Sequence, residues 1–379
     1  MARKNVPLGQ KKIIFVHTKN DFGGTSLILS EIIQGVTEHE YQVEIFMGRS
    51  KTEGFLSSFV NIPIYTYPFY ESKKAWLEGI YLIIFQIYLF FKLLRYARQD
   101  VAFYVNTIKP WGAGLAGWVL KKRVLYHIHE ISFTPKVLDT FCRFFVKLSA
   151  HDIIFVSNFI RRKKNIDVSR KHVVHNALSP GFIAKTIPPT PKDTFTILML
   201  CNLKVYKGVI EFVHIARRLP QYHFELVLNA TDDEINAFFK KIRFSENLTV
   251  HSSQPSVHRF YARASLVVNL SHPDKWLESF GMTILEAMNY GLPVIVPPIG
   301  GISELVIDNY NGFHISYNDT DKLISTIIKI AEDPELYLRL STGALEMVKK
   351  FSYNTMINNI ISIIKTGQSL PDDSLTQQN

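Results

Sequence analysis

The sequence predicts an α/β protein with two doubly wound parallel sheets. Two series of short apolar runs alternate with helical segments, one over about residues 12–180 and one from residue 195 onward. Strands that are separated by helices are typical of parallel βαβ units. The 379 residues suit two domains, and a proline-rich stretch at 180–193 separates the two series. We therefore predict domains at 1–180 and 181–355, a last helix at 356–366 and a disordered tail at 367–379.

Each expected strand is a short run of β-branched and aromatic residues. Ligands of open parallel sheets bind beyond the carboxyl ends of the strands, so the loops after these runs are where site residues are expected. A cleft between the two domains is the expected ligand site. The expected strands are residues 12–16, 42–47, 62–65, 101–105, 124–127, 153–156 and 172–174, then 195–200, 223–228, 248–250, 266–270 and 294–296.

The positive charge is concentrated in the first domain. Residues 1–180 contain 25 Lys and Arg against 13 Asp and Glu, and the remainder contains 18 against 20, which gives the formal net charge of +10. This asymmetry suits an anionic membrane or a phosphate-bearing acceptor, and no nucleic-acid recognition motif is present. The dense basic cluster at 161–164 is interpreted as a solvated helix face.

Two features bear on location. Only two cysteines occur and residues 1–16 lack the long apolar stretch of a signal peptide, so a reducing, cytoplasmic setting is expected. The charge-free run 79–91 is shorter than the roughly 20 residues that span a bilayer. Because Trp76 precedes it and Lys92, Arg95 and Arg98 follow it, it is either an interfacial helix at the inner face of a membrane or a buried helix of the domain.

Two acids, Glu278 and Glu286, lie between the expected strands 266–270 and 294–296. A helix that opens near Gly281 to Thr283 would point free backbone N–H groups at the carboxyl end of the sheet, where they can bind a phosphate. Carboxylates are poor phosphate ligands but good acceptors for the hydroxyls of a ribose and a sugar. The segment therefore predicts a site for a nucleoside diphosphate sugar. A surface helix with two unrelated acids would leave Glu278 unexplained.

This segment resembles the E-x7-E signature of the retaining GT-B glycosyltransferases of family 4. The resemblance extends through Phe280-Gly281, Glu286-Ala287-Met288, Gly291-Leu292-Pro293 and Gly300-Gly301-Ile302-Ser303-Glu304. It implies a GT-B fold, in which two Rossmann-like domains face each other across a cleft and the last helix returns to the first, acceptor-binding domain. It also implies that the diphosphate leaves on the face that the acceptor hydroxyl attacks and takes its proton, so that neither a metal nor another cofactor is required.

The resemblance also implies the roles of individual residues. Glu278 would bind the hydroxyls of the donor sugar, Glu286 the ribose, and Lys207 the diphosphate. His129 would contact the transferred sugar. The expected catalytic residues are His129, Glu278 and Lys207, and the expected donor-binding residues are Gly23, Gly24, Asn202, Lys204, Lys207, Glu278, Phe280, Gly281, Met282, Thr283 and Glu286.

Two loops of the first domain support this assignment less specifically. Gly23 and Gly24 follow the first strand and precede a helical segment, which suits either a ligand-binding loop or a plain tight turn. His127 and His129 would share one face of their strand. A metal site formed with Glu130 and a simple buried histidine pair are the alternatives to sugar contact.

One position departs from the family pattern. In Asn202-Leu203-Lys204-Val205-Tyr206-Lys207-Gly208 the lysine of the pattern matches Lys207, but Asn202 stands where an arginine is expected. Asparagine supplies neither charge nor a bidentate fork, so Lys204 would have to help bind the diphosphate, or activity is weak. The two lysines can also be plain loop residues. Asp319-Thr320-Asp321 has the spacing of a metal motif but precedes a helical pattern, which favours a helix cap.

The sequence thus predicts a hexosyltransferase that uses a nucleotide-sugar donor and a glycan or lipid-linked acceptor, as in bacterial surface polysaccharide synthesis. A catalytically weak scaffold that binds a partner, and an epimerase of the same fold, are the alternatives. Neither the sugar, the base nor the acceptor is specified by the side chains.

Overall fold

The computed structural model describes residues 12–49, 53–70, 75–131, 135–188 and 194–370, without the side chains of residues 75 and 76. The predicted role of Trp76 therefore falls outside the described side chains. The chain forms two compact units. The N-terminal unit contains Met1–Asn176 and Asn354–Asn379, and the C-terminal unit contains Ala177–Tyr353.

The N-terminal unit is built on a seven-stranded parallel sheet in the order β3-β2-β1-β4-β5-β6-β7. All seven strands occur where the sequence predicts them, with ends that differ by one or two residues. The strand order reverses between β1 and β4, which is the point where open α/β sheets bind ligands. The strands are β1 (Lys12–His17), β2 (Gln42–Gly48), β3 (Ile64–Tyr67), β4 (Ala102–Asn106), β5 (Arg123–Ile128), β6 (Asp152–Phe155) and β7 (Lys171–Val173).

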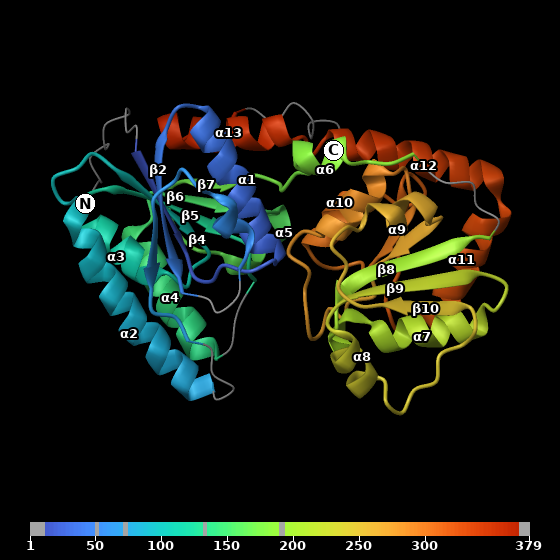
Figure 1. Ribbon diagram of the computed structural model, residues 1–379. Helices are drawn as coiled ribbons and strands as arrows, with labels where there is room; N and C mark the ends of the chain where they lie inside the picture. Colours follow the sequence, from blue (N-terminus) through green and yellow to red (C-terminus); the bar gives the residue numbers. More distant parts are fainter. Residues whose placement is uncertain (1–11, 50–52, 71–74, 132–134, 189–193, 371–379) are drawn as a thin grey trace. The chain divides into compact units, whose positions relative to one another are not determined.

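Helices cover both faces of this sheet. Three of them, α2, α3 and α4, pack side by side, and α1 lies with the C-terminal helix α13 on the opposite face (Figure 1). Gly35 of α1 meets Ile357 of α13, and Arg123 donates to the Ile363 carbonyl at 2.6 Å. The helices are α1 (Gly24–Glu38), α2 (Ala75–Leu93), α3 (Trp111–Val119), α4 (Lys136–Ser149), α5 (Asn158–Lys164) and α13 (Tyr353–Thr366), with 3-10 turns η1 (Phe55–Ser58) and η2 (Leu94–Tyr96).

The C-terminal unit has a six-stranded parallel sheet in the order β10-β9-β8-β11-β12-β13, and its order reverses between β8 and β11. The sequence did not predict β13, because this strand has only three residues and follows the turn at Asn309, which has φ +62°. The strands are β8 (Thr196–Asn202), β9 (His223–Asn229), β10 (Leu248–His251), β11 (Leu266–Val268), β12 (Val294–Val296) and β13 (Gly312–His314).

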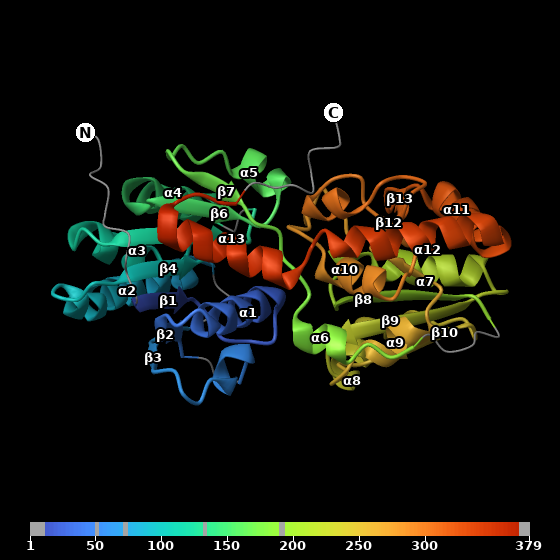
Figure 2. The ribbon, with the colours of Figure 1, turned by 90° about the horizontal axis from the view of Figure 1, so that it is seen from above.

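The helices of this unit include α12, which contacts both α10 and α11 beside the sheet (Figure 2). A short helix, α6, lies within the stretch expected to be a linker, because Ser179 caps it and Pro180 occupies its first turn. The helices are α6 (Pro180–Ala184), α7 (Val209–Arg218), α8 (Asp232–Phe238), α9 (His258–Arg263), α10 (Met282–Asn289), α11 (Thr320–Glu332) and α12 (Pro334–Lys349), with 3-10 turns η3 (Val205–Lys207) and η4 (Gly301–Leu305).

Three expectations about surface segments need correction. Lys164 is not solvated, because its Nζ atom lies 3.0 Å from buried Asp139. Residues 367–370, expected to be disordered, fold back on α13, where the Leu370 N–H donates to Asn359 at 2.9 Å. The charge-free run 79–91 is part of a longer apolar helix. By length and composition alone, Leu77–Tyr96 is long enough to cross a membrane, although 22% of the window is buried in the protein.

Candidate functional site

Glu278 lies in the loop after β11 and is held by an ion pair. Its Oε1 atom is 2.5 Å from Nζ of Lys207 and accepts a hydrogen bond from the Ser271 hydroxyl at 2.8 Å. Its Oε2 atom accepts a long hydrogen bond, 3.4 Å, from the Trp276 indole. Burial opposes ionisation of Glu278, but the charge of Lys207 and the hydrogen bonds outweigh it, so the pKa is lowered. The site therefore holds an ionised carboxylate that can accept further hydrogen bonds.

Lys207 reaches Glu278 because the chain turns sharply behind it. Gly208 has φ +81°, and a Cβ atom on it would lie 2.3 Å from the Leu270 carbonyl oxygen at the end of β11. Only glycine permits this approach of the η3 turn to the strand end. The Lys207 Nζ atom also lies 5.1 Å from the ring centroid of Trp276. Because its ammonium group has three donors, it can contact both Glu278 and an anion.

The first turn of α10 lies in the same loop region. The helix begins at Met282, as predicted, and Gly281 precedes it in the left-handed conformation with φ +110°. No side chain caps the helix, and the first intrahelical bonds run from Ile284 and Leu285 to Gly281. The N–H groups of Met282 and Thr283 therefore have no backbone partner in the described residues. This positive helix end is suited to an anion such as phosphate.

Glu286 lies one turn further along α10 and differs from Glu278 in its electrostatics. It is half-buried, and its Oε2 atom accepts a hydrogen bond from Tyr261 at 2.7 Å. Burial raises the pKa of Glu286 to about 7, although the Tyr261 hydrogen bond opposes the shift. Without a cation beside it, this carboxyl changes charge near neutral pH.

Three other predicted donor residues have side chains that take no part in the Lys207–Glu278 ion pair. Asn202, the last residue of β8, accepts a hydrogen bond from Asn229 at 3.2 Å, and Asn229 in turn accepts one from Ser253 at 2.8 Å. Lys204 is exposed and pairs with no acid among the described residues. The Phe280 side chain is buried against Phe351, so its role is in packing rather than in a side-chain contact with a ligand.

The N-terminal unit contains a second, neutral cluster at the point where its strand order reverses. His17 ends β1, Asn106 ends β4 and His129 follows β5. Asn106 lies between the two imidazoles, 3.1 Å from His17 Nδ1 and 2.9 Å from His129 Nε2. Burial lowers the pKa of His17 to about 4 and holds the pKa of His129 well below its usual value. Both rings are therefore neutral at pH 7.

The hydrogen bonds fix which nitrogen of each ring carries the proton. Ser26 donates its hydroxyl proton to Asp21 at 2.9 Å, so its oxygen accepts from Nε2–H of His17 at 3.1 Å. The Nδ1 atom of neutral His17 then accepts from the Asn106 amide, and the Asn106 oxygen accepts from Nε2–H of His129. The Nδ1 atom of His129 is left as an acceptor, which suits a sugar hydroxyl.

The glycine loop forms the start of this network. Gly23 precedes α1, and its N–H donates to Asp21 at 2.9 Å. A Cβ atom on Gly24 would meet nothing within 4 Å, so a ligand can approach the backbone at the helix N-terminus. The loop is thus both the expected tight turn and an open helix end.

The histidine pair has the predicted shared face but not the geometry of the alternative metal site. The rings of His127 and His129 lie 4.2 Å apart. Glu130 instead accepts hydrogen bonds from the backbone N–H groups of Ile108 and His129. Across the described residues, no group of three or more His, Cys, Asp or Glu is arranged to hold a metal ion. Asp319 caps α11 by accepting from the Lys322 N–H, as predicted.

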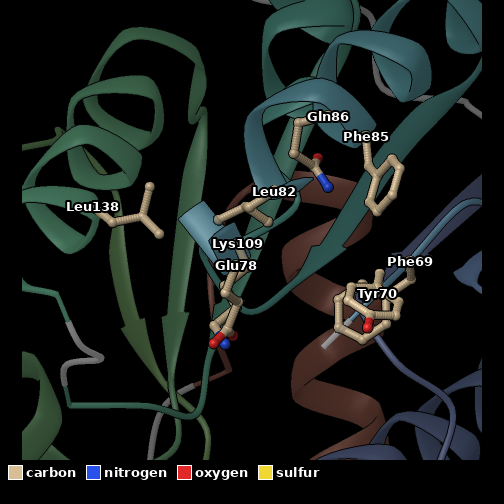
Figure 3. A pocket seen from close by; sticks show the side chains of 8 residues that line it. All are labelled: Phe69, Tyr70, Glu78, Leu82, Phe85, Gln86, Lys109 and Leu138. Carbon is tan, nitrogen blue, oxygen red and sulfur yellow. The ribbon is translucent and has the colours of Figure 1, made fainter. Parts of the chain in front are cut away.

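A pocket opens in the N-terminal unit beside the first half of α2 (Figure 3). It lies at the carboxyl end of the sheet, because some of its residues follow β3 and β4. Apolar and aromatic side chains form most of its wall, with one acid and one base. Its lining residues are Phe69, Tyr70, Glu78, Leu82, Phe85, Gln86, Lys109 and Leu138.

Several residues of these clusters were missed in the sequence. Ser271 and Trp276 lie beside Glu278, and their place directly after a predicted strand was an available signal. Asn106 directly follows the predicted strand 101–105 and is the last residue of β4. Tyr261 is 25 positions before Glu286 on a different helix, and no local pattern links the two.

Residues 183–347 match the family model for glycosyl transferases group 1, which covers most of the C-terminal unit and includes Lys207, Glu278 and Glu286. The C-terminal unit is a group 1 glycosyltransferase domain. An uncharacterized glycosyltransferase of Methanocaldococcus jannaschii is 25% identical over 243 residues, and the match covers 58% of this chain. The chain spans only 61% of that relative's length.

Solved glycosyltransferase structures extend the likeness to both units. HepE of Anabaena, solved in complex with UDP-glucose, is 19% identical, with a TM-score of 0.74 over 93% of this chain and 99% of HepE. The lipopolysaccharide outer core galactosyltransferase WaaB is 18% identical, with a TM-score of 0.68 over 92% of this chain and 99% of WaaB. This likeness shows the GT-B fold, with the group 1 glycosyltransferase domain as its C-terminal half.

Proposed function

We propose that this protein is a retaining, metal-independent glycosyltransferase. It moves a sugar from a nucleoside diphosphate sugar to a hydroxyl of a glycan or lipid-linked acceptor, in surface polysaccharide synthesis at the inner face of a bacterial membrane. The observation that carries the proposal is the ionised Glu278, held by Lys207 beside the open N-terminus of α10. These groups place a sugar-hydroxyl acceptor directly beside donors for a diphosphate.

Each group has a distinct task in this proposal. Lys207 and the first N–H groups of α10 bind the diphosphate and stabilise the negative charge that grows on it as the sugar leaves. Glu278 accepts hydrogen bonds from the sugar, and Glu286 accepts them from the ribose. His129 accepts a further sugar hydroxyl through Nδ1. The departing phosphate oxygen takes the proton of the acceptor hydroxyl on the same face, which retains the anomeric configuration.

The solved structures support parts of this proposal. HepE is described in complex with UDP-glucose, which supports a UDP-sugar as the first donor to test. WaaB is described as a galactosyltransferase of the lipopolysaccharide outer core, which supports a surface glycan as acceptor. The pocket beside α2, whose wall is mostly apolar and aromatic, supports an acceptor that has an apolar part.

Calorimetric titration with UDP, GDP, ADP, CMP and dTDP in the presence of EDTA tests the donor site. We expect micromolar binding of one nucleotide, lost in Glu286→Ala and retained in Glu234→Ala, which removes an exposed acid of α8. Binding of none of the five would contradict the proposal. Anomeric NMR of the product then tests retention, and an inverted product would overturn the mechanism.

A catalytically weak binding scaffold is the second candidate, because Asn202 pairs with Asn229 and supplies no charge to the donor site. Slow hydrolysis of the donor sugar without acceptor distinguishes the two. Hydrolysis that disappears in Glu278→Gln supports the enzyme. Tight nucleotide binding without any hydrolysis or transfer supports the scaffold.

A further inference from the structure

The outward side of α2 is apolar along its whole described length. The exposed positions fall at helical spacing and form one stripe, and none of the six is charged. Phe91 is 64% exposed and Ile84 51%, values that are unusual for large apolar side chains on a helix. The stripe, called here the α2 stripe, contains Ile80, Ile83, Ile84, Ile87, Tyr88 and Phe91.

The neighbouring helices extend this apolar surface. α3 packs between α2 and α4, and its last turn exposes Trp118. Phe144 of α4 is 59% exposed. Contiguous apolar surface of this kind marks a place where a protein contacts another molecule or a membrane.

Basic residues gather at one end of the same helical layer. All three helices connect parallel strands, so they run in the same direction and their C-terminal ends lie together (Figure 1). Residues 91–100, 118–122 and 144–150 contain six Lys and Arg and a single acid, Asp100. Lys92, Arg98, Lys121 and Lys147 of this basic end are exposed. A surface that is apolar along its length and cationic at its end is complementary to an anionic lipid bilayer.

The inner side of α2 decides how the helix can meet a bilayer. Leu89 and Leu93 are fully buried, and the Gly112 N–H of α3 donates to the Gln86 side chain at 3.2 Å. A Cβ atom on Gly112 would lie 2.1 Å from the Gln86 carbonyl oxygen, so the two backbones are in close contact. With one side fixed to the domain, α2 cannot leave it to span a membrane. It can only lie in the plane of the interface.

We propose that the α2 stripe and Trp118 dock the N-terminal unit on an anionic bilayer, with the basic end bound to lipid phosphates. The inference rests on the proposed function, because it takes the acceptor to be linked to a lipid. The apolar part of that acceptor would reach the pocket beside α2 from the bilayer. A second copy is a poorer occupant, because its α2 stripe contains no acid that could pair with the basic end.

A vesicle flotation assay with the full chain tests the docking surface. One set of vesicles contains phosphatidylcholine alone, and the other also contains about 30 mol% phosphatidylglycerol, on the order of natural anionic content. We expect the chain to float with the anionic vesicles. Salt at 0.5 M, roughly a threefold rise over physiological ionic strength, should weaken binding. Ile84→Glu/Phe91→Glu should lower the bound fraction about tenfold. Lys92→Glu/Arg98→Glu/Lys121→Glu should abolish the preference for anionic lipid. Leu338→Glu, which changes an exposed leucine of α12, is the matched control and should bind like wild type.

The outcomes are separable from those of the proposed function. Nucleotide titration of each variant needs no membrane, so unchanged nucleotide affinity with lost flotation supports the docking surface. Equal flotation of wild type and both multiple variants would overturn it, whatever the activity. A concentration-dependent dimer in sedimentation, lost in Ile84→Glu/Phe91→Glu while no vesicle binding is seen, would assign the surface to a second copy instead. Melting curves exclude variants that have unfolded.

Discussion

The polar cluster of the C-terminal unit is an ion pair, whereas the polar cluster of the N-terminal unit is neutral. In the C-terminal unit, Lys207 and Glu278 are both charged and in direct contact. In the N-terminal unit, His17, Asn106 and His129 form a neutral hydrogen-bonded chain that ends on Asp21. A charged cluster suits a diphosphate, whereas a neutral chain with a fixed acceptor suits hydroxyl groups. In the proposed function, the charged cluster therefore binds the diphosphate and the neutral chain positions the sugar.

The two units also differ in the polarity of one exposed helix surface. The exposed side of α11 contains Asp321, Lys322, Ser325, Lys329 and Glu332, which is the polar pattern of a solvated helix. The exposed side of α2 has the apolar α2 stripe instead. Two helices that each cover one face of a parallel sheet thus expose side chains of opposite polarity.

Removal of the cation from the charged cluster should have the largest effect. Lys207→Ala leaves the Glu278 carboxylate without its partner and removes charge stabilisation from the leaving diphosphate. We expect donor turnover to fall about 100- to 1,000-fold. Lys240→Ala, which removes an exposed lysine of the same unit, is the matched control and should leave turnover unchanged. Equal losses in both variants would mean that Lys207 has no special contact with the donor.

The neutral chain makes a different prediction. Asn106→Leu removes the group that holds the proton on Nε2 of His129, so the ring can adopt the other tautomer. We expect kcat to fall roughly tenfold or more while nucleotide affinity stays unchanged. Nitrogen-15 shifts of His129 report the tautomer directly, and the wild type should show a proton on Nε2 that Asn106→Leu no longer holds there. Loss of activity with an unchanged His129 spectrum would reject the positioning role.

The sequence predicted the charged cluster better than the neutral chain, for a physical reason. Glu278, Gly281 and Glu286 lie within one loop and helix, and their spacing is a local consequence of a βαβ unit. The neutral chain joins β1, β4 and β5, which are up to 112 residues apart, and only the strand order of the sheet brings them together. Strand positions could be predicted from apolar runs, but the pairing that creates this chain could not.

A similar limit explains the remaining differences. β13 is too short to show an alternating pattern, and Lys164 in a run of four basic residues gives no sign that Asp139 of another helix buries it. The charge-free run 79–91 is also shorter than α2, because the helix begins before the run and continues through residues 92 and 93. Local sequence predicted element type, whereas burial depended on distant partners.

The pH dependence of nucleotide binding should distinguish the role of Glu286 from that of Glu278. Its pKa of about 7 means that the carboxylate, the form that accepts ribose hydroxyls, is gained as pH rises through 7. Nucleotide affinity should therefore increase about tenfold between pH 6 and pH 8. Glu286→Gln should bind more weakly and show a much smaller pH dependence, and the dependence that remains in this variant reports the ionisation of the nucleotide phosphate. Identical pH profiles for wild type and variant would exclude Glu286 from the ribose contact.

The smallest expected effect comes from adding to the charged cluster the cation that the family pattern has at position 202. Asn202 ends β8 and is bonded to Asn229, so the donor site has one cation fewer than the family pattern. If Lys204 supplies the missing charge when the donor binds, Asn202→Arg should raise nucleotide affinity only several-fold, which is the value of one partly exposed ion pair. In a Lys204→Ala background the same change should give a larger gain, because the two cations would then be alternatives. Equal gains in affinity in both backgrounds would show that Lys204 does not contact the diphosphate. A gain in turnover of a hundredfold or more would identify Asn202 as the cause of a weak natural activity.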